Sequence, residues 1–189
     1  AKHQVSFNEF RELDRWALLE LNKLIMRVRK AYEEYEFHAV YHAIHHFCTV
    51  EMSARYLDIV KDILYCQPVN SLERRAVQTV LYRVLHSLIR LLVPVLAFTS
   101  EEAWRYVPKL EGEPESVQLT DMPEVDEDYL DPQLESKWQR LLQIRGAVNG
   151  ALEVARKEKI IGNSLEASVL LYLPDNLYEF LNPQKQDLN

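Results

Sequence analysis

Long stretches of helical periodicity constrain the fold of this chain more than any other feature. Between residues 10 and 36, apolar side chains recur every three or four positions, which places them on one side of a helix. They are Leu13, Trp16, Ala17, Leu21, Leu24, Val28, Ala31 and Tyr35. The same spacing predicts helices over 37–65, 70–92, 99–107 and 132–159. Only 4 of the 189 residues are glycine, which favours long helices over a turn-rich β architecture.

Capping residues and prolines predict where the third and fourth helices begin and end. Asn70 or Ser71 is expected to cap the third helix, and Pro94 to end or kink it. Thr99 or Ser100 is expected to cap the fourth helix, with acidic residues in its first turn. The first four helical stretches are therefore separated by short breaks, as in an antiparallel bundle.

Composition divides the chain into three parts. Residues 1–107 are predicted to form the antiparallel helical bundle. Residues 108–130 are rich in proline and acid and are interpreted as an irregular linker with one short extended piece at 116–119. Residues 131–189 combine a long helix with a short strand at 164–174, as an incomplete subdomain. The predicted fold is therefore mainly α, with a helical bundle followed by a long helix and a fragment of α/β structure.

Other features of the sequence limit where the protein could be located and what it could bind. No apolar run reaches the roughly 18 residues that a membrane span needs, and the first ten residues do not resemble a signal peptide. Cys48 and Cys66 form neither a disulfide framework nor a close-spaced metal pair, so a reducing, cytoplasmic setting is expected. The formal net charge of -7 argues against nonspecific binding to nucleic acid, but it leaves room for a locally basic face.

Two helices carry stripes of cationic and polar residues. At about 100° per residue, the predicted outward side of the first helix carries Arg15, Leu19, Asn22, Lys23, Met26, Arg29 and Lys30. The third helix gathers a stripe without acids, formed by Arg75, Thr79, Arg83, His86 and Arg90. Either stripe could bind a phosphate backbone and pack on bases, or it could be an ordinary solvated helix side. The pattern alone leaves both interpretations open.

The second helix begins with "FHAVYHAIHHFC", which holds four histidines and a cysteine in twelve residues. The histidines share one side of the helix; they are His38, His42, His45 and His46. A pair at i, i+4 spacing can chelate a metal, but a zinc site needs three or four ligands and one helix face supplies two. We therefore expect surface histidines and no metal site. Near Thr49–Ser53 the apolar stripe drifts in phase, which predicts a bend or interruption.

The sequence offers no set of catalytic residues. The four glycines are scattered, so there is no glycine-rich phosphate loop. No serine stands in the context of a Ser–His–Asp triad, and Glu101 and Glu102 are explained by a helix start. We expect the chain by itself to be non-catalytic and to hold no cofactor.

Several motifs resemble the anticodon-binding region of class I aminoacyl-tRNA synthetases of the isoleucyl, valyl and leucyl group. The resemblance rests on "FCTVEMSARYLDIVKDILY", "ELDRWALLELN", "LIRLLVPVLAFTSEEAW" and "VNGALEVARKEKIIGNSLEASVLLY". It covers nearly the whole chain, and its last motif, with "SARYLDIVKD", favours the isoleucyl member. Ile63 stands where that group usually has arginine.

The resemblance implies a function. Such a synthetase is a cytoplasmic ligase that charges tRNA(Ile) with isoleucine using ATP and Mg²⁺. Its catalytic and editing domains, and the zinc module of bacterial members, are expected outside this chain. The expected partners are the anticodon stem-loop of tRNA(Ile) and the remaining domains of the parent enzyme, with no membrane and no DNA. A valyl or leucyl homologue, or a helical protein-interaction module without RNA binding, is the alternative.

The resemblance also favours particular RNA contacts. Unpaired loop bases are recognised by stacking and hydrogen bonding, while contacts to phosphates set the register. On the outward side of the first helix, the implied contacts are Arg15, Asn22, Lys23, Met26 and Arg29. By position in related synthetases, the end of the second helix adds Arg55, Lys61 and Asp62.

Overall fold

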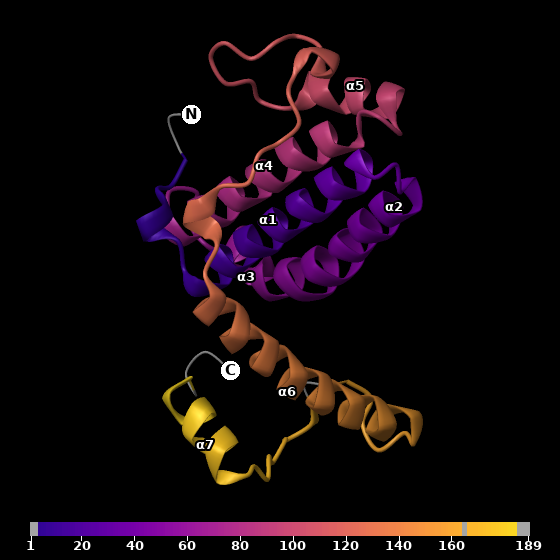
Figure 1. Ribbon diagram of the computed structural model, residues 1–189. Helices are drawn as coiled ribbons and strands as arrows, with labels where there is room; N and C mark the ends of the chain where they lie inside the picture. The colour runs from indigo at the N-terminus through magenta and orange to yellow at the C-terminus, as the bar shows by residue number, and fades with distance from the viewer. Residues whose placement is uncertain (1–3, 164–165, 185–189) are drawn as a thin grey trace. The chain divides into compact units, whose positions relative to one another are not determined.

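The computed structural model describes residues 4–163 and 166–184 of the chain (Figure 1). The long helices are α1 Glu12–Glu33, α2 Phe37–His46, α3 Asp58–Cys66, α4 Leu72–Leu92, α5 Ala97–Tyr106, α6 Pro132–Lys157 and α7 Asp175–Leu181. A π-helix, η2 Phe47–Leu57, joins α2 to α3, and short 3₁₀ helices are η1 Phe7–Glu9, η3 Val117–Leu119, η4 Glu127–Tyr129 and η6 Asn182–Gln184. The predicted mainly α fold is confirmed. The chain forms two compact units, one ending at Trp138 and the other beginning at Gln139.

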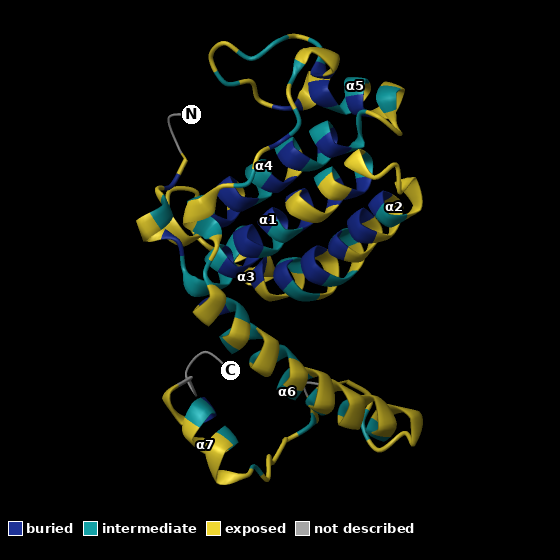
Figure 2. Cartoon of the chain, viewed as in Figure 1, coloured by how far each residue is buried: buried dark blue, intermediate teal, exposed yellow. Residues whose placement is uncertain are grey.

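The first unit is a bundle in which α1 packs against α2, η2 and α4 (Figure 1). Its centre is apolar, and Figure 2 shows the buried sides of these helices turned toward one another. One buried carboxylate also ties α1 to the neighbouring helix. Asp14 receives two hydrogen bonds from the Arg11 guanidinium, at 2.9 and 3.0 Å, and one from the Tyr56 hydroxyl at 2.8 Å. A buried charge needs such partners, so this residue fixes how η2 lies on α1.

The interruption expected near Thr49–Ser53 is confirmed as the π-helix η2. The buried residues Phe47, Met52, Tyr56 and Val60 explain why the helix widens there. The first step between them is five residues and the next two are four, so regular α geometry would carry Met52 away from the core. One π-helical segment therefore keeps both halves of the long second helix packed on the bundle, α2 on α1 and α3 on α4.

The start and end of α4 follow the sequence prediction. Ser71 is the N-cap, and its hydroxyl accepts a hydrogen bond from the Arg74 backbone N–H at 3.3 Å. The helix ends at Leu92, two residues before Pro94. Both features are local, since a cap and a proline act on the neighbouring turn alone.

The prediction for the start of α5 is wrong. This helix begins at Ala97, so Thr99 and Ser100 lie inside its first turns rather than at its cap. The backbone N–H groups of Val95 and Leu96 donate to the Leu92 carbonyl at 3.1 and 2.7 Å. This tight turn leads directly into the next helix, so the chain has no extended stretch in which a later residue could act as the cap.

The acidic segment after α5 is packed on the bundle. We call residues 108–131 the connector. Val117 is fully buried with Ile89, Trp104 and Val107, which closes a small apolar cluster between α4, α5 and the connector. The predicted extended piece at 116–119 is wrong, because residues 117–119 form the 3₁₀ helix η3. The Ser116 hydroxyl accepts from the Gln118 N–H at 3.2 Å, which favours a turn over an extended chain.

The second unit contains most of α6, the chain that follows it, and α7. The strand predicted over 164–174 is wrong wherever it can be judged: residues 164 and 165 lie outside the described residues, and 166–174 form no strand. Apolar β-prone residues need a second strand to complete a hydrogen-bonded ladder, and the described residues provide none. The expected fragment of α/β structure is therefore helical and irregular.

Candidate nucleic-acid interface

The side of α1 predicted to face outward is partly covered. Leu19 and Asn22 are each only 2% exposed, so the expectation that both reach solvent is wrong. The connector and the start of α6 lie over this side. Trp138 of α6 stacks on Trp16 with ring centroids 5.2 Å apart, and Lys137 pairs with Glu12 at 2.7 Å. A helical wheel identified the side opposite the bundle core, but it could not show that a later segment returns to cover it.

Asn22 is occupied by the connector. Its side-chain Nδ2 donates to the Asp126 carbonyl at 2.5 Å, and its Oδ1 accepts from the Asp126 N–H at 3.2 Å. The amide therefore pairs with one residue of the connector through both of its polar ends. Because the side chain is also buried, an RNA base could reach it only after the connector had moved.

Three cations of the predicted set are also engaged or partly buried. Arg29 donates from Nη1 to the Pro123 carbonyl at 3.1 Å. Lys23 lies between Glu20 and Glu135, at 3.0 and 2.7 Å. Burial opposes the charge on Lys23, but the two carboxylates together raise its pKa; burial also raises the pKa of Glu20. Arg15 is half-buried, and its Nε has no hydrogen-bond partner among the described residues.

The C-terminal half of α1 keeps an uncovered surface. Met26 is 42% exposed, and Arg27 and Lys30 are exposed beside it. Lys30 approaches Glu34 at 3.8 Å, both in solvent, whereas no ion pair is found for Arg27 among the described residues. We call Met26, Arg27 and Lys30 the α1 strip. Arg27 was missed from the sequence, although it follows Lys23 at i+4 and so shares its side of the helix.

The predicted residues of η2 and α3 lie at a separate place. Arg55 donates to Glu51 at 2.5 Å, Lys61 pairs with Asp58 at 2.8 Å, and Asp62 is exposed. Since α1 and the second long helix run antiparallel, these residues lie toward the start of α1, where Tyr56 contacts Asp14. The eight predicted residues therefore do not form one patch.

The basic stripe on α4 is covered by the connector as well. His86 contacts Glu113 at 2.6 Å, and Arg90 donates to the Asp121 carbonyl at 3.4 Å. The Arg83 guanidinium lies over the rings of Phe10 and Tyr129, at 5.5 and 5.3 Å from their centroids. The partners of this stripe, a carboxylate, a backbone carbonyl and two rings, thus come largely from a segment far away in the sequence, and the solvated-side interpretation is wrong for these three residues.

The four histidines of α2 are exposed, as predicted. His46 approaches Glu51 at 3.4 Å, while His42 and His45 adjoin the ring of Tyr41. Among the described residues, no three His, Cys, Asp or Glu side chains are grouped so that they could hold a metal ion. Within the same residues, no helix is long and apolar enough to cross a membrane.

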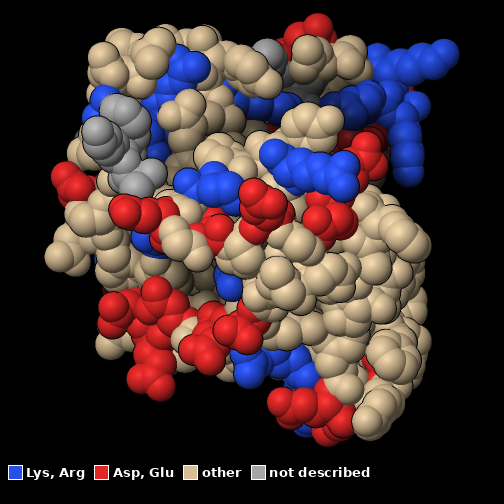
Figure 3. All heavy atoms as spheres, turned by 90° about the horizontal axis from the view of Figure 1, so that it is seen from above, with Lys and Arg blue, Asp and Glu red and all other residues tan. Residues whose placement is uncertain are grey.

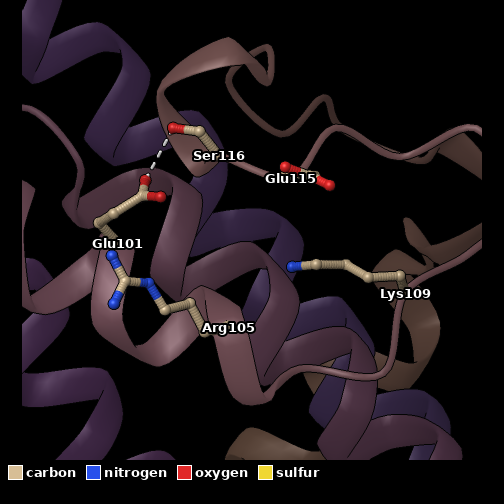
Figure 4. Close-up of a pocket in the computed structure, with 5 residues that line it drawn as sticks. All are labelled: Glu101, Arg105, Lys109, Glu115 and Ser116. Carbon is tan, nitrogen blue, oxygen red and sulfur yellow. Dashed lines mark hydrogen bonds between the residues drawn. The ribbon is translucent and has the colours of Figure 1, made fainter.

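An open pocket of about 470 Å³ lies between α5 and the connector (Figure 4). It is lined by Glu101, Arg105, Lys109, Glu115 and Ser116. Glu101 is engaged structurally, since it accepts from the Ser116 hydroxyl at 2.8 Å and from the Val117 N–H at 3.1 Å. The lining balances two acids with two cations. Figure 3 shows the same character on one face of the molecule, where acidic and basic side chains are interspersed.

Comparison with known proteins identifies related chains. The family described as the anticodon-binding domain of tRNA ligase matches residues 14–171. A protein of Carboxydothermus hydrogenoformans, named isoleucine–tRNA ligase, is 56% identical over 180 residues, which are 95% of this chain and 19% of the relative. Proteins of the same name from Moorella thermoacetica and Desulforamulus reducens are each 54% identical over 187 residues, 99% of this chain and 20% of the relative. The chain thus spans about a fifth of the length of these relatives.

Proposed function

We propose that this chain, which belongs to the family of anticodon-binding domains of tRNA ligases, binds the anticodon arm of an isoleucine tRNA within an isoleucine–tRNA ligase. The observation that carries the proposal is the family match over residues 14–171, supported by relatives of that name at 54–56% identity. Attachment of isoleucine, with its need for ATP and Mg²⁺, belongs in this proposal to other parts of a longer enzyme.

The uncovered cations of α1 supply a physical basis for such binding. Arg27 and Lys30 can each neutralise a phosphate, and the exposed side chain of Met26 on the same helix can pack against a base. Of the residues expected from sequence, we retain Met26, Lys61 and Asp62 as proposed contacts because their side chains are exposed. Arg55 and Lys23 are retained as well, since their side chains are 30% and 36% exposed although each pairs with a carboxylate. Asn22 and Arg29 serve instead to hold the connector.

Fluorescence anisotropy with a labelled anticodon arm tests the proposal. The arm of an isoleucine tRNA should bind the chain more tightly than a valine-tRNA arm or a hairpin with an unrelated loop. Affinity should fall as salt increases, because bound phosphates release counterions. Arg27→Glu and Lys30→Glu should each weaken binding and lower the slope of log K against log salt by about 0.7. Arg105→Glu, at an exposed cation of α5, is the matched control and should change neither quantity.

The alternatives give different results in the same experiment. Binding that favours the valine-tRNA arm would assign the chain to another member of the synthetase group. The absence of salt-sensitive binding above that of the unrelated hairpin would support a helical protein-interaction module in place of an RNA-binding domain.

A further inference from the structure

The exposed side of α2 presents aromatic and imidazole rings to solvent. Tyr41 is 63% exposed and Phe37 is 51% exposed. Together with the exposed imidazoles on the same side they form what we call the ring surface of α2, consisting of Phe37, His38, Tyr41, His42 and His45. The buried side of the helix is formed by other residues, Val40, Ala43 and Ile44, so the ring surface is not needed to hold α2 on the bundle.

The rings adjoin one another around Tyr41. Its ring centroid lies 5.3 Å from that of His42, in an edge-on arrangement, and 5.7 Å from that of His45, tilted by 31°. At the N-terminal end of the helix, Phe37 contacts the rings of Tyr32 and Tyr35 at 6.1 and 6.4 Å. Rings that pack edge-on leave faces available to a further flat group.

Charge also distinguishes this surface from the rest of an acidic protein. The ten residues of α2 include no Asp, Glu, Lys or Arg, although the chain as a whole has a formal net charge of -7. Glu33, Glu34 and Glu36 lie at the turn before the helix and bound the surface on that side. A polyanion can approach the middle of α2 without meeting a carboxylate there, and the α1 strip lies on the adjoining helix of the same hairpin (Figures 1 and 2).

We propose that the ring surface of α2 stacks against unpaired nucleobases of RNA, with Tyr41 as its central contact. The inference rests on the proposed function and extends it, because it adds a base-stacking surface to the cations of α1. Recognition of single-stranded RNA commonly combines basic groups that follow the backbone with aromatic or histidine rings that stack on splayed bases. The α1–α2 hairpin carries the two kinds of group on helices that pack against each other.

The test uses the full chain and the isoleucine-tRNA anticodon arm. Tyr41→Ala should weaken binding about 10-fold, within the roughly 5- to 150-fold range that loss of one stacked base produces. Tyr41→Phe keeps the ring and should bind within about twofold of the unmodified chain. His42→Gln removes a second ring while retaining a polar side chain, and should give a smaller loss. Tyr106→Ala removes an exposed tyrosine of α5, away from every proposed RNA contact, and is the matched control.

Two further readouts separate stacking from charge and from folding. Tyr41→Ala should leave the salt slope unchanged, because no cation is removed, whereas Arg27→Glu lowers it. A double-stranded RNA of the same stem, which offers no unpaired base, should bind equally well to the Tyr41→Ala and unmodified chains. The thermal midpoints of the two chains should agree, since the Tyr41 side chain is mostly in solvent.

The outcomes are distinguishable. If the arm binds the unmodified chain and Tyr41→Ala binds it equally well, the stacking surface is refuted while the proposed function stands. If the substitution instead converts a dimer into a monomer in sedimentation without changing RNA affinity, the ring surface is a protein contact and the inference is wrong. If the unmodified chain binds no arm above the unrelated hairpin, the proposed function itself fails.

Discussion

The position of a polar residue on a helical wheel does not predict whether its side chain is buried or exposed in this protein. Asn22 and Lys30 lie on the same half of α1, yet Asn22 is buried under the connector and Lys30 is 72% exposed. Leu19 and Trp16 are covered in the same way by the connector and α6. The wheel reports the angle of a side chain about its own axis, and burial depends in addition on segments that follow more than a hundred residues later.

Asn22→Ala should therefore destabilise the protein. The substitution leaves the N–H and carbonyl of Asp126 without their partner, which costs about 1–3 kcal/mol of unfolding free energy. The thermal midpoint should fall by roughly 2–4 °C per kcal/mol for a chain of this length. Urea titration followed by far-UV circular dichroism measures the change.

Lys30→Ala serves as the control for this substitution, because it removes an exposed side chain of the same helix. It should change the free energy of unfolding by less than about 0.5 kcal/mol. The opposite result would be an Asn22→Ala chain that is as stable as the Lys30→Ala chain but binds an anticodon arm more weakly than the unmodified chain does. That result would show that Asn22 contacts RNA rather than stabilising the fold.

Helix periodicity identified α1 and α4 because each buries a continuous side against a neighbour over several turns. It also identified α6, although Leu134 is the one buried residue of that helix. It also located the phase drift that the structure resolves into the π-helix η2. Periodicity could not predict that the connector packs on the bundle. It docks through backbone carbonyls, such as those of Pro123 and Asp126, and through a few side chains, among them Val117 and Tyr129. Backbone groups are common to every residue type, so no residue pattern records which of them will be used.

The docking of the connector on α4 should depend on pH through His86. Burial, and next the nearby Arg90 guanidinium, lower the pKa of His86 although the Glu113 carboxylate opposes them. A histidine whose pKa is lower in the folded than in the unfolded chain contributes stability that is fully present above the unfolded value, about 6.5. That contribution is lost as pH falls through the folded pKa.

Thermal unfolding at pH 7.5 and 5.5 measures this effect. The unmodified chain should lose more stability on acidification than His86→Gln does, because only the unmodified chain holds a histidine whose pKa is lowered by folding. His38→Gln removes an exposed histidine and should behave as the unmodified chain does. Equal losses in the unmodified and His86→Gln chains would exclude His86 as the titrating group.

At the scale of the whole molecule, the first compact unit includes the connector and the start of α6, whereas composition placed the end of the bundle at residue 107. Trp138, Val117 and Asn22 explain why the unit is longer. Each joins the bundle to a segment beyond residue 107, through a ring stack, an apolar cluster and a pair of hydrogen bonds. Low hydrophobicity made the connector resemble a linker, but a buried valine, the Tyr129 ring, the Glu113 carboxylate and several backbone contacts dock it.

Two truncated chains test where the folding unit ends. A chain that stops after Leu142 should unfold cooperatively, because it retains Val117 and the stack of Trp138 on Trp16. A chain that stops after Val107 uncovers Trp16, Leu19 and Trp104, so it should bind a hydrophobic dye, self-associate and unfold at a lower midpoint. Identical midpoints for the two chains would place the boundary at residue 107 after all.

The sequence by itself determined the mainly α fold, the positions of the long helices, the cap of α4 and the exposure of the four histidines. These features follow from periodicity and from contacts within a turn or two, which the order of residues records directly. Only the tertiary structure decided which cations remain uncovered, because the connector binds Arg29, His86 and Arg90 from a distance in the chain. The uncovered part of the α1 side is consequently smaller than the helical stripe predicted, whereas Arg27, Lys30 and Tyr41 of the α1–α2 hairpin are exposed among the residues that the structure describes.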